Sequence, residues 1–341
     1  MLFLSLVALL AAPAPPAAKV EVVSREAERR VDVSIDGKPF TAYIWPESQM
    51  KPSLWPIRTA KGTEITRGYP IAPKPGERTD HRHHVGLWFS YGDVNGVDFW
   101  NNSTARKPEE QARMGRTVQR RIVEAKGGAE GRLTVAADWL LPGDKLALAE
   151  ESAFVFRALP SGRWIERTTT LRAKDGAVSL KDNKEGVFGL RVARTLEHPS
   201  PATEKGSVVG PDLRDGPSGP LDNAGITGSY RSSEGKVGDA VWGTRGRWVA
   251  LSGRAGEEDV VLVIFDHPKN PGAPTYWHAR GYGLFAANPL GQKELSAGKD
   301  TLDYAIPQGG SAVFRHALAV LGGPFDEARV EELYRGFAAK P

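Results

Sequence analysis

Three of the seven histidines lie within four residues, at His81, His83 and His84. Imidazole titrates near neutral pH and is the commonest metal ligand, so this cluster is suited to acid–base catalysis or to metal binding. If the segment is extended, His81 and His83 point to one face and His84 to the other. The simpler alternative is that the rings only hydrogen-bond the loop backbone and stack on nearby tryptophans. Because carboxylates flank the cluster, we favour a functional site.

The residues that follow combine aromatic rings with a polar turn. Trp88 and Trp100 bracket a loop that contains Asp93, Asn95 and Asp98. The loop resembles a calcium-binding loop, but its glycine comes too early and no glutamate closes it. We therefore interpret it as a tight turn whose polar groups contact a ligand. The two tryptophans would offer stacking faces to that ligand.

Glu185 begins a second informative stretch, at the head of a predicted strand that contains Arg191. The two residues are an even number of positions apart, so they share one face of the strand. A carboxylate in this position is suited to act as a general base, and burial would raise its pKa toward neutral pH. Arg191 would bind an oxyanion or carboxylate of the ligand. The alternative is an ordinary surface ion pair of Glu185 with a neighbouring Lys or Arg.

A third stretch supplies further imidazole and aromatic groups. Tyr276, His278 and Arg280 fall on one face of a predicted strand and Trp277 on the other, while His267 precedes them in a turn. A flat ring beside cationic and imidazole groups is typical of a surface that binds a sugar ring or an organic anion. We predict that His278 is an acid–base group and that His267, Trp277 and Arg280 contact the ligand. The alternative is that these aromatic residues belong to the core and that His278 caps a turn.

The elements around these stretches indicate an all-β protein. Gly and Pro number 38 and 25, and short alternations of apolar and polar residues recur between turn signals. One helix is predicted at 325–339, with its apolar residues on one stripe. Residues 197–236 lack periodicity and are either a lid over the site or a flexible insertion. The predicted strands are 20–24, 30–35, 40–45, 117–124, 132–140, 146–156, 163–172, 241–251, 259–265, 301–306 and 312–320.

Composition narrows the function and the location. The net charge of +4 is scattered along the chain, which argues against a nucleic-acid or anionic-membrane partner. Cys is absent, so there are no disulfides, thiolate metal sites or cysteine nucleophile. Residues 1–18 are an apolar run followed by small residues and prolines, typical of a secretory signal peptide. We expect a periplasmic or secreted protein with one domain over 19–341 and no membrane contact after cleavage.

The informative stretches also resemble a known bacterial family. The runs DHRHHVGLWFSYGDVNGVDFW, EGVFGLRV, VWGTRGRWV and DHPKNPGAPTYWHARGYGLFAANPLG are similar to the PmoA-like family, called "methane oxygenase PmoA" and essentially without known function. The resemblance covers the chain from residue 20 onward. It implies an exported protein of polysaccharide-degrading bacteria with a large β-sandwich of the galactose-mutarotase supersandwich type. Kinship with a membrane oxygenase subunit has no support, because no apolar stretch of membrane length follows residue 18.

Our leading hypothesis is an exported carbohydrate-active protein, with an enzyme as the favoured form. His81, His83, His84 and His278 would supply acid–base and hydrogen-bonding groups, and Glu185 a base. Mutarotation, epimerisation, lyase cleavage and hydrolysis all require such groups around a sugar ring, so the sequence does not choose among them. The expected partner is a small molecule or an oligosaccharide, and no cofactor is assigned.

Two alternatives stay open at this point. In the first, two of the clustered histidines join His267 or His278 and a carboxylate such as Asp80 to hold a metal for an oxygenase or a hydrolase. In the second, the protein is a sugar-binding module without catalysis, for which the aromatic residues suffice.

Overall fold

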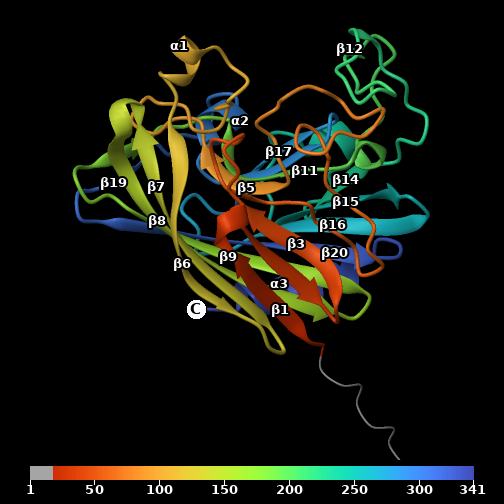
Figure 1. The fold of residues 1–341 in the computed structure, drawn as a ribbon, viewed down its shortest axis with the longest axis horizontal. Coiled ribbons are helices and arrows are strands. Elements are labelled where there is room, and N and C mark those ends of the chain that lie inside the picture. The colour runs from red at the N-terminus through yellow and green to blue at the C-terminus, as the bar shows by residue number, and fades with distance from the viewer. Residues whose placement is uncertain (1–17) are drawn as a thin grey trace, which may run out of the picture.

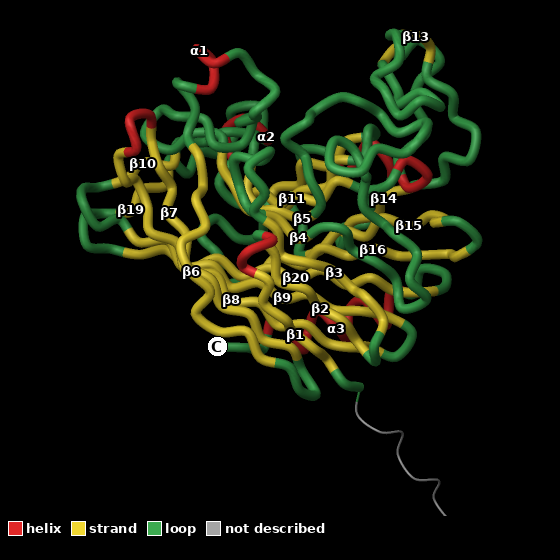
Figure 2. Tube along the Cα trace, in the orientation of Figure 1, coloured by secondary structure: helices red, strands yellow, loops and turns green. Residues whose placement is uncertain are grey.

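The protein is nearly all β in the computed structural model, which describes residues 18–341 and has 45% strand and 10% helix. Figures 1 and 2 show two large sheets stacked face to face, with loops gathered at one end. The ladders of both sheets are antiparallel. The prediction of an all-β fold, a large β-sandwich with one C-terminal helix, is confirmed.

The first sheet has eight strands, and a tight hairpin loop joins its second strand to its third. Asp36 and Gly37 have φ values of 53° and 73°, the left-handed geometry that a two-residue hairpin loop requires. The strands, in spatial order, are β1 (Val20–Arg25), β2 (Arg30–Ile35), β3 (Lys38–Ile44), β4 (Ser53–Leu54), β5 (Leu87–Tyr91), β11 (Gly186–Arg191), β18 (Leu284–Asn288) and β17 (Tyr276–Arg280).

The second sheet also has eight strands, and four of them form the meander expected from the alternating pattern. Its strands, in spatial order, are β14 (Ser229–Ser232), β15 (Trp248–Ala255), β16 (Glu258–Asp266), β20 (Ser311–Gly322), β9 (Gly162–Arg172), β8 (Lys145–Leu159), β7 (Gly131–Leu141) and β6 (Arg116–Lys126). Two small ladders pair β10 (Val178–Leu180) with β19 (Tyr304–Ile306) and β12 (Lys205–Gly206) with β13 (Gly219–Pro220).

The core lies between the inner faces of the two sheets. Phe89 and Phe285 of the first sheet and Phe154 and Leu262 of the second belong to one buried cluster. Because side chains alternate along a strand, each sheet also has an outer face, which a helix or loops can cover.

Each outer face is covered differently. On the second sheet, helix α3 (Glu327–Ala338) packs Val330, Tyr334 and Phe337 against Trp164 and Phe265. On the first sheet no long helix is present among the described residues, and loops cover the face instead. The remaining helical pieces are α1 (Pro108–Gln111), α2 (Gln292–Leu295) and the 3₁₀ turns η1 (Glu26–Glu28), η2 (Pro142–Asp144), η3 (Arg194–Leu196) and η4 (Gly238–Val241).

Buried charges attach the segment 197–236 to the loop that precedes the histidine cluster. Glu197 is fully buried and accepts a hydrogen bond from Arg78 Nε at 2.7 Å. Arg78 also binds Ser200 Oγ at 2.5 Å and Glu204 at 2.6 Å. The segment expected to be a lid or an insertion is therefore held against the cluster's own loop by ion pairs.

The predicted leader, residues 1–18, falls outside the described residues except for Ala18. Within residues 18–341, no helix is both long enough and apolar enough to cross a membrane.

Candidate functional site

A single arginine shapes the loop that carries the histidines. Arg67 is 1% exposed, and its guanidinium donates to Asp80 Oδ1 at 2.7 Å. It also donates to the backbone carbonyls of Arg78, Asp80, His81 and His84, at 2.8–3.2 Å. The two terminal nitrogens of one planar guanidinium thus fix the backbone of the turn. Nothing in the sequence around Arg67 marks it as a residue of the site.

His81 is the accessible member of the cluster and is oriented by Asp80. Its Nδ1 lies 3.0 Å from Asp80 Oδ2, and its side chain is 37% exposed. Asp80 also accepts from Arg191 Nη2 at 2.6 Å. Burial raises the pKa of Asp80, but Arg191, His81 and Arg67 outweigh burial and hold this pKa well below its usual value. The ionised carboxylate fixes the imidazole by one nitrogen and leaves Nε2 for a ligand.

The expected alternation of the histidines is wrong, because the chain turns here instead of extending. His84 N donates to His81 O at 2.9 Å, and His81 has a φ of 41°. As a result His81 and His84, predicted on opposite faces, stack at 4.8 Å between ring centroids. Tyr282 stacks on the outer side of His81 at 4.8 Å, and Trp88 lies under His84 at 4.9 Å. The four rings form one column from the surface to the sheet.

Strand register places His278 in the same row of the outer face as Trp88, three strands away. Trp88 pairs with Gly189, Gly189 with Ala286, and Ala286 with His278. These residues form one row across the outer face of the first sheet. A Cβ on Gly189 would lie 2.7 Å from the Trp88 ring, so only glycine leaves room for the indole. Tyr276, His278 and Arg280 share this face and Trp277 lies on the other, as predicted. That other face is the core, where Trp277 is buried instead of contacting a ligand.

His278 forms a second imidazole–carboxylate pair with Glu185. Its Nδ1 lies 3.8 Å from Glu185 Oε2 and has no hydrogen-bond partner among the described residues. Burial, with contributions from Lys184, Arg280 and His81, lowers the pKa of His278 to about 3. His278 is therefore neutral at physiological pH. Glu185 is partly exposed and also pairs with Lys184.

The deeper rings are buried and neutral. His83 is 7% exposed and His84 1%, and burial, reinforced by nearby positive charges, lowers the pKa of each well below its ordinary value. The Nε2 atoms of His83 and His84 and the Nε1 atoms of Trp88 and Trp100 are buried without a hydrogen-bond partner among residues 18–341. Buried polar atoms normally have partners, so these ring nitrogens are available to a bound water or ligand.

Lys51 is a buried amine beside this cluster. It is 5% exposed, and its Nζ donates to Trp100 O at 2.7 Å and to Asn102 Oδ1 at 2.5 Å. Both acceptors are uncharged. Burial lowers the pKa of Lys51 to about 7, although Asp98 opposes the shift, and the positive charge of Lys51 in turn lowers the pKa of His83.

We predict that Lys51→Met removes a pH dependence from the stability of the protein. The pKa of Lys51 is about 7 when folded and about 10.4 when unfolded. Between these values the unfolded chain binds more protons, so the free energy of unfolding rises with pH by up to about 1.4 kcal/mol per unit. Below pH 7 the penalty for burying the charge is complete. Denaturant titrations at pH 7, 8 and 9 measure this slope, which the variant should lack.

An exposed lysine supplies the control for this measurement. Lys145→Met should keep the slope of the natural protein, because Lys145 lies on the surface. Parallel pH curves for the natural protein and Lys51→Met would show that Lys51 is not the group responsible.

Several residues that were expected to contact a ligand lie in the core, lie on the other sheet or are bound to another side chain. Trp277 is fully buried in the core between the sheets. His267 lies under α3 on the other sheet, with its ring 5.2 Å from that of Phe337, so it cannot join the histidine cluster. Arg191 is fully buried and committed to Asp80. The sequence could not show which sheet face these residues occupy.

The aromatic and polar residues around the 93–98 loop mainly build the loop itself. Asp93 Oδ1 accepts from Gly96 N at 2.9 Å, and Asn95 Oδ1 from Ser179 N at 2.8 Å. Asp98 Oδ1 accepts from Trp100 N at 2.8 Å and Asn101 N at 2.9 Å. Trp88 and Trp100 are fully buried and therefore support the histidines instead of offering an open stacking face. No three or more His, Cys, Asp or Glu within residues 18–341 form a group arranged to hold a metal ion.

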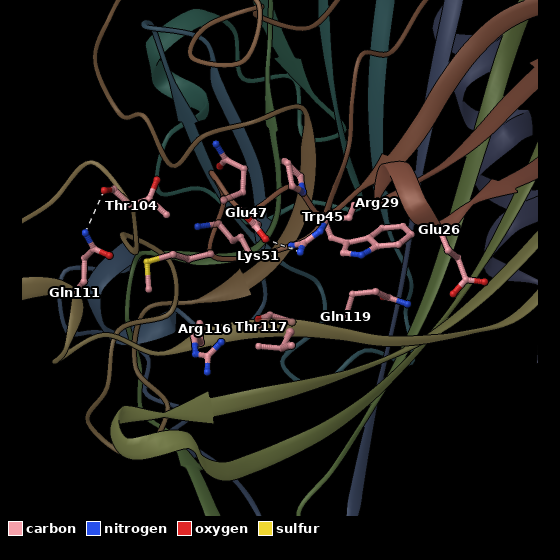
Figure 3. A pocket seen from close by; sticks show the side chains of 14 residues that line it. Glu26, Arg29, Trp45, Glu47, Lys51, Thr104, Gln111, Arg116, Thr117 and Gln119 are labelled. Atoms are coloured by element: carbon pink, nitrogen blue, oxygen red, sulfur yellow. Dashed lines mark hydrogen bonds and ion pairs between the residues drawn. The ribbon is translucent and has the colours of Figure 1, made fainter. Parts of the chain in front are cut away.

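Two cavities lie near the site. One of about 410 Å³ extends from Tyr282 and Arg280 to Trp242. Another of about 600 Å³ lies between β6 and residues 45–51, and Figure 3 shows its lining, which includes Trp45, Lys51 and an Arg29–Glu47 ion pair. The second cavity includes none of the residues that the sequence analysis singled out, whereas the first includes Arg280.

Comparison with known proteins adds a family and little else. A family model described as "Family of unknown function (DUF6807)" matches residues 30–335. It carries no PmoA name. No curated protein matches the chain.

Two solved structures show distant likeness. The Slr1438 protein from Synechocystis sp. PCC 6803 is 7% identical with a TM-score of 0.33, over 93% of this chain and 100% of that one. A GH36 α-galactosidase from Geobacillus stearothermophilus, crystallised with stachyose, is 11% identical with a TM-score of 0.35, over 83% of this chain and 39% of that one. Likeness at this level supports no inference about activity.

Proposed function

This chain belongs to DUF6807, a family of unknown function, and from the chemistry of its site we propose that it is an enzyme that performs acid–base catalysis on a sugar or sugar acid. We further propose that it acts outside the cytoplasm, on the composition of residues 1–18. The observation that carries the proposed activity is the Asp80–His81 pair. The imidazole of His81 is partly exposed, and the Asp80 carboxylate that orients it is held by the buried guanidiniums of Arg67 and Arg191.

His81 is suited to move a proton at Nε2. Asp80 accepts from Nδ1 and selects the tautomer and the orientation of the ring, as a carboxylate does in a catalytic imidazole pair. Tyr282 on one side and His84 on the other restrict the ring to one plane. A proton donor or acceptor held in one orientation needs no reorganisation when the substrate arrives.

Glu185 supplies a second group on the same outer face. The pKa of the Tyr282 phenol is raised to about 12, mainly by burial. The negative charges of Glu185 and Asp80 also raise this pKa. His278 beside Glu185 is neutral and has a free Nδ1, so it can orient a substrate hydroxyl. An imidazole and a carboxylate that face one ligand are the pair required to move protons on a sugar ring.

The surface around these groups fits a sugar better than an apolar ligand. Arg191 is committed to Asp80, so the clamp expected from Arg191 or Arg280 is left to Arg280, which is exposed and makes no ion pair in the described part of the chain. An unpaired guanidinium near two acid–base groups favours a substrate that carries hydroxyl groups and a carboxylate.

The test is a turnover screen in deuterated water. The protein is incubated with neutral sugars and uronic acids, and ¹H NMR follows anomer exchange, loss of ring C–H signals and new unsaturated or cleaved products. We expect one of these changes with the natural protein. Glu185→Gln should slow that change by about tenfold or more, because an amide cannot accept the proton.

A matched carboxylate serves as the control. Glu151 is exposed on β8 of the second sheet, and Glu151→Gln should keep full turnover. If the natural protein binds a sugar but forms no product over long incubation, the proposal fails and the protein is a sugar-binding module. Equal rates for Glu185→Gln and the natural protein would remove Glu185 from the mechanism.

A further inference from the structure

Trp242 is the one tryptophan of residues 18–341 that is exposed. Its exposed fraction is 38%, whereas six others are fully buried. It follows the short turn η4 and lines the cavity of about 410 Å³ beside the proposed catalytic groups. A large apolar ring is left in solvent at a free-energy cost. An aromatic face in a polar cavity is the usual stacking surface for a sugar ring.

Arg280 lies between this ring and the catalytic groups. Its Cζ is 5.8 Å from the ring centroid of Trp242 and 5.8 Å from that of Tyr282. The guanidinium makes no ion pair or side-chain hydrogen bond within residues 18–341, so its donors are free. Most other arginines of the site have a carboxylate partner, as Arg78, Arg191 and Arg194 do.

The cavity adjoins the proposed catalytic site at Tyr282. The same phenol ring that borders the cavity stacks on His81 at 4.8 Å. A ligand that contacts both Trp242 and His81 also has to pass Arg280 and Tyr282, so we expect it to be longer than one sugar ring.

We infer that Trp242 and Arg280 form a subsite for a carboxylated sugar ring next to the ring that reacts, and that the substrate is an oligosaccharide of uronic acids. The ring stacks on Trp242, and Arg280 binds its carboxylate, a contact for which the guanidinium geometry is well suited. This inference rests on the proposed function only for what happens at His81, because binding at the subsite needs no turnover.

The other polar groups of the cavity are consistent with a sugar. Glu204 is already paired with Arg78, so its charge is partly neutralised. Asp239 makes no side-chain hydrogen bond within the described residues and is exposed, so it can accept bonds from ring hydroxyls. His198 lines the cavity as a further polar contact.

Isothermal titration calorimetry tests the subsite without relying on catalysis. Trimers of galacturonate and of mannuronate are compared with neutral trimers of galactose and mannose. We expect one uronate trimer to bind at least about tenfold tighter than its neutral counterpart, and the difference to shrink as salt is added. Trp242→Ala and Arg280→Met should each weaken that binding about tenfold or more. Arg254→Met, which alters an exposed surface pair with Asp259, should leave it unchanged.

The outcomes separate this inference from the proposed activity. Tight uronate binding that the two variants abolish, in a protein that turns over no sugar, supports the subsite and refutes the activity. Turnover of a uronate trimer whose KM is unchanged in Trp242→Ala and Arg280→Met refutes the subsite and leaves the activity standing. Equal affinity for charged and neutral trimers also refutes the subsite.

Discussion

Replacing His81 by glutamine is expected to lower kcat/KM for the substrate found in the screen by about 10²–10⁴, mostly through kcat. Glutamine can still hydrogen-bond Asp80, so the loop should keep its shape, but it cannot accept and return a proton. The stacking partners Tyr282 and His84 remain in place, so KM should change little. Steady-state kinetics with the natural protein and the variant measure both constants.

His267 provides a matched control for this substitution. Like His81, His267 follows an aspartate in the sequence. Unlike His81, it is fully buried and lies under α3 on the other sheet. His267→Gln should keep kcat/KM within about twofold. If His81→Gln retains most of the activity, or if His267→Gln loses as much, His81 is not the catalytic group.

The fold could be predicted closely because its strands follow a local rule. Each alternation of apolar and polar residues in the meander corresponds to a strand with one face in the core and one face turned outward. The Asp36–Gly37 hairpin and helix α3 also depend on neighbouring residues alone. Most predicted bounds differ from the observed ones by a few residues, for example 40–45 against Lys38–Ile44 for β3. The strand predicted over 241–251 is an exception, because residue 241 ends the turn η4 and the strand β15 runs over Trp248–Ala255.

The site was predictable only in part. The strand face of Tyr276, His278 and Arg280 was predicted correctly, because β17 is a regular strand. The predicted arrangement of the three clustered histidines was wrong. A turn held by tertiary contacts with Arg67 replaces the extended backbone on which that prediction depended. Alternation applies to a strand and not to a loop whose shape distant residues determine.

The residues that sequence reasoning missed are charges and rings whose burial is decided by the whole fold. Arg67 and Lys51 look like ordinary surface charges in the sequence, and nothing local shows that each is almost fully buried. Trp242 is the reverse case, since it falls in the predicted strand 241–251 but lies exposed in the turn before β15. The Pro- and Gly-rich composition of residues 46–77 was a weak signal that this long loop has a tertiary role.

Replacing Arg67 by methionine is expected to reduce the free energy of unfolding by about 3–5 kcal/mol, the usual loss when one partner of a buried ion pair is removed. In the variant, Asp80 loses its ion pair with Arg67 and keeps only the one with Arg191. The backbone carbonyls of His81 and His84 also lose the donor that they share. Denaturant titration measures the loss. Because the loop positions His81, activity should fall as well, even at temperatures where the variant is folded.

Arg82 is the matched control, since it contacts the same aromatic ring from the surface. The Cζ atoms of Arg67 and Arg82 lie 5.4 and 5.1 Å from the Tyr69 ring centroid, but Arg82 is 44% exposed and pairs with Asp215. Arg82→Met should cost no more than about 1 kcal/mol. A similar small loss for Arg67→Met would show that its buried bonds add little to stability.

Acid should reduce the difference in stability between Arg67→Met and the natural protein. The pKa of Asp80 is held well below that of an unfolded aspartate, about 3.9, so the carboxylate stabilises the fold above that pH. This stabilisation is lost as pH falls through the lower, folded pKa. Because the variant has already lost part of the interaction, its deficit in unfolding free energy should be largest near neutral pH and shrink below about pH 4. A deficit that stays constant from pH 7 to pH 3 would mean that Arg67 stabilises the loop through its carbonyl bonds alone, and that Asp80 is held in place by Arg191.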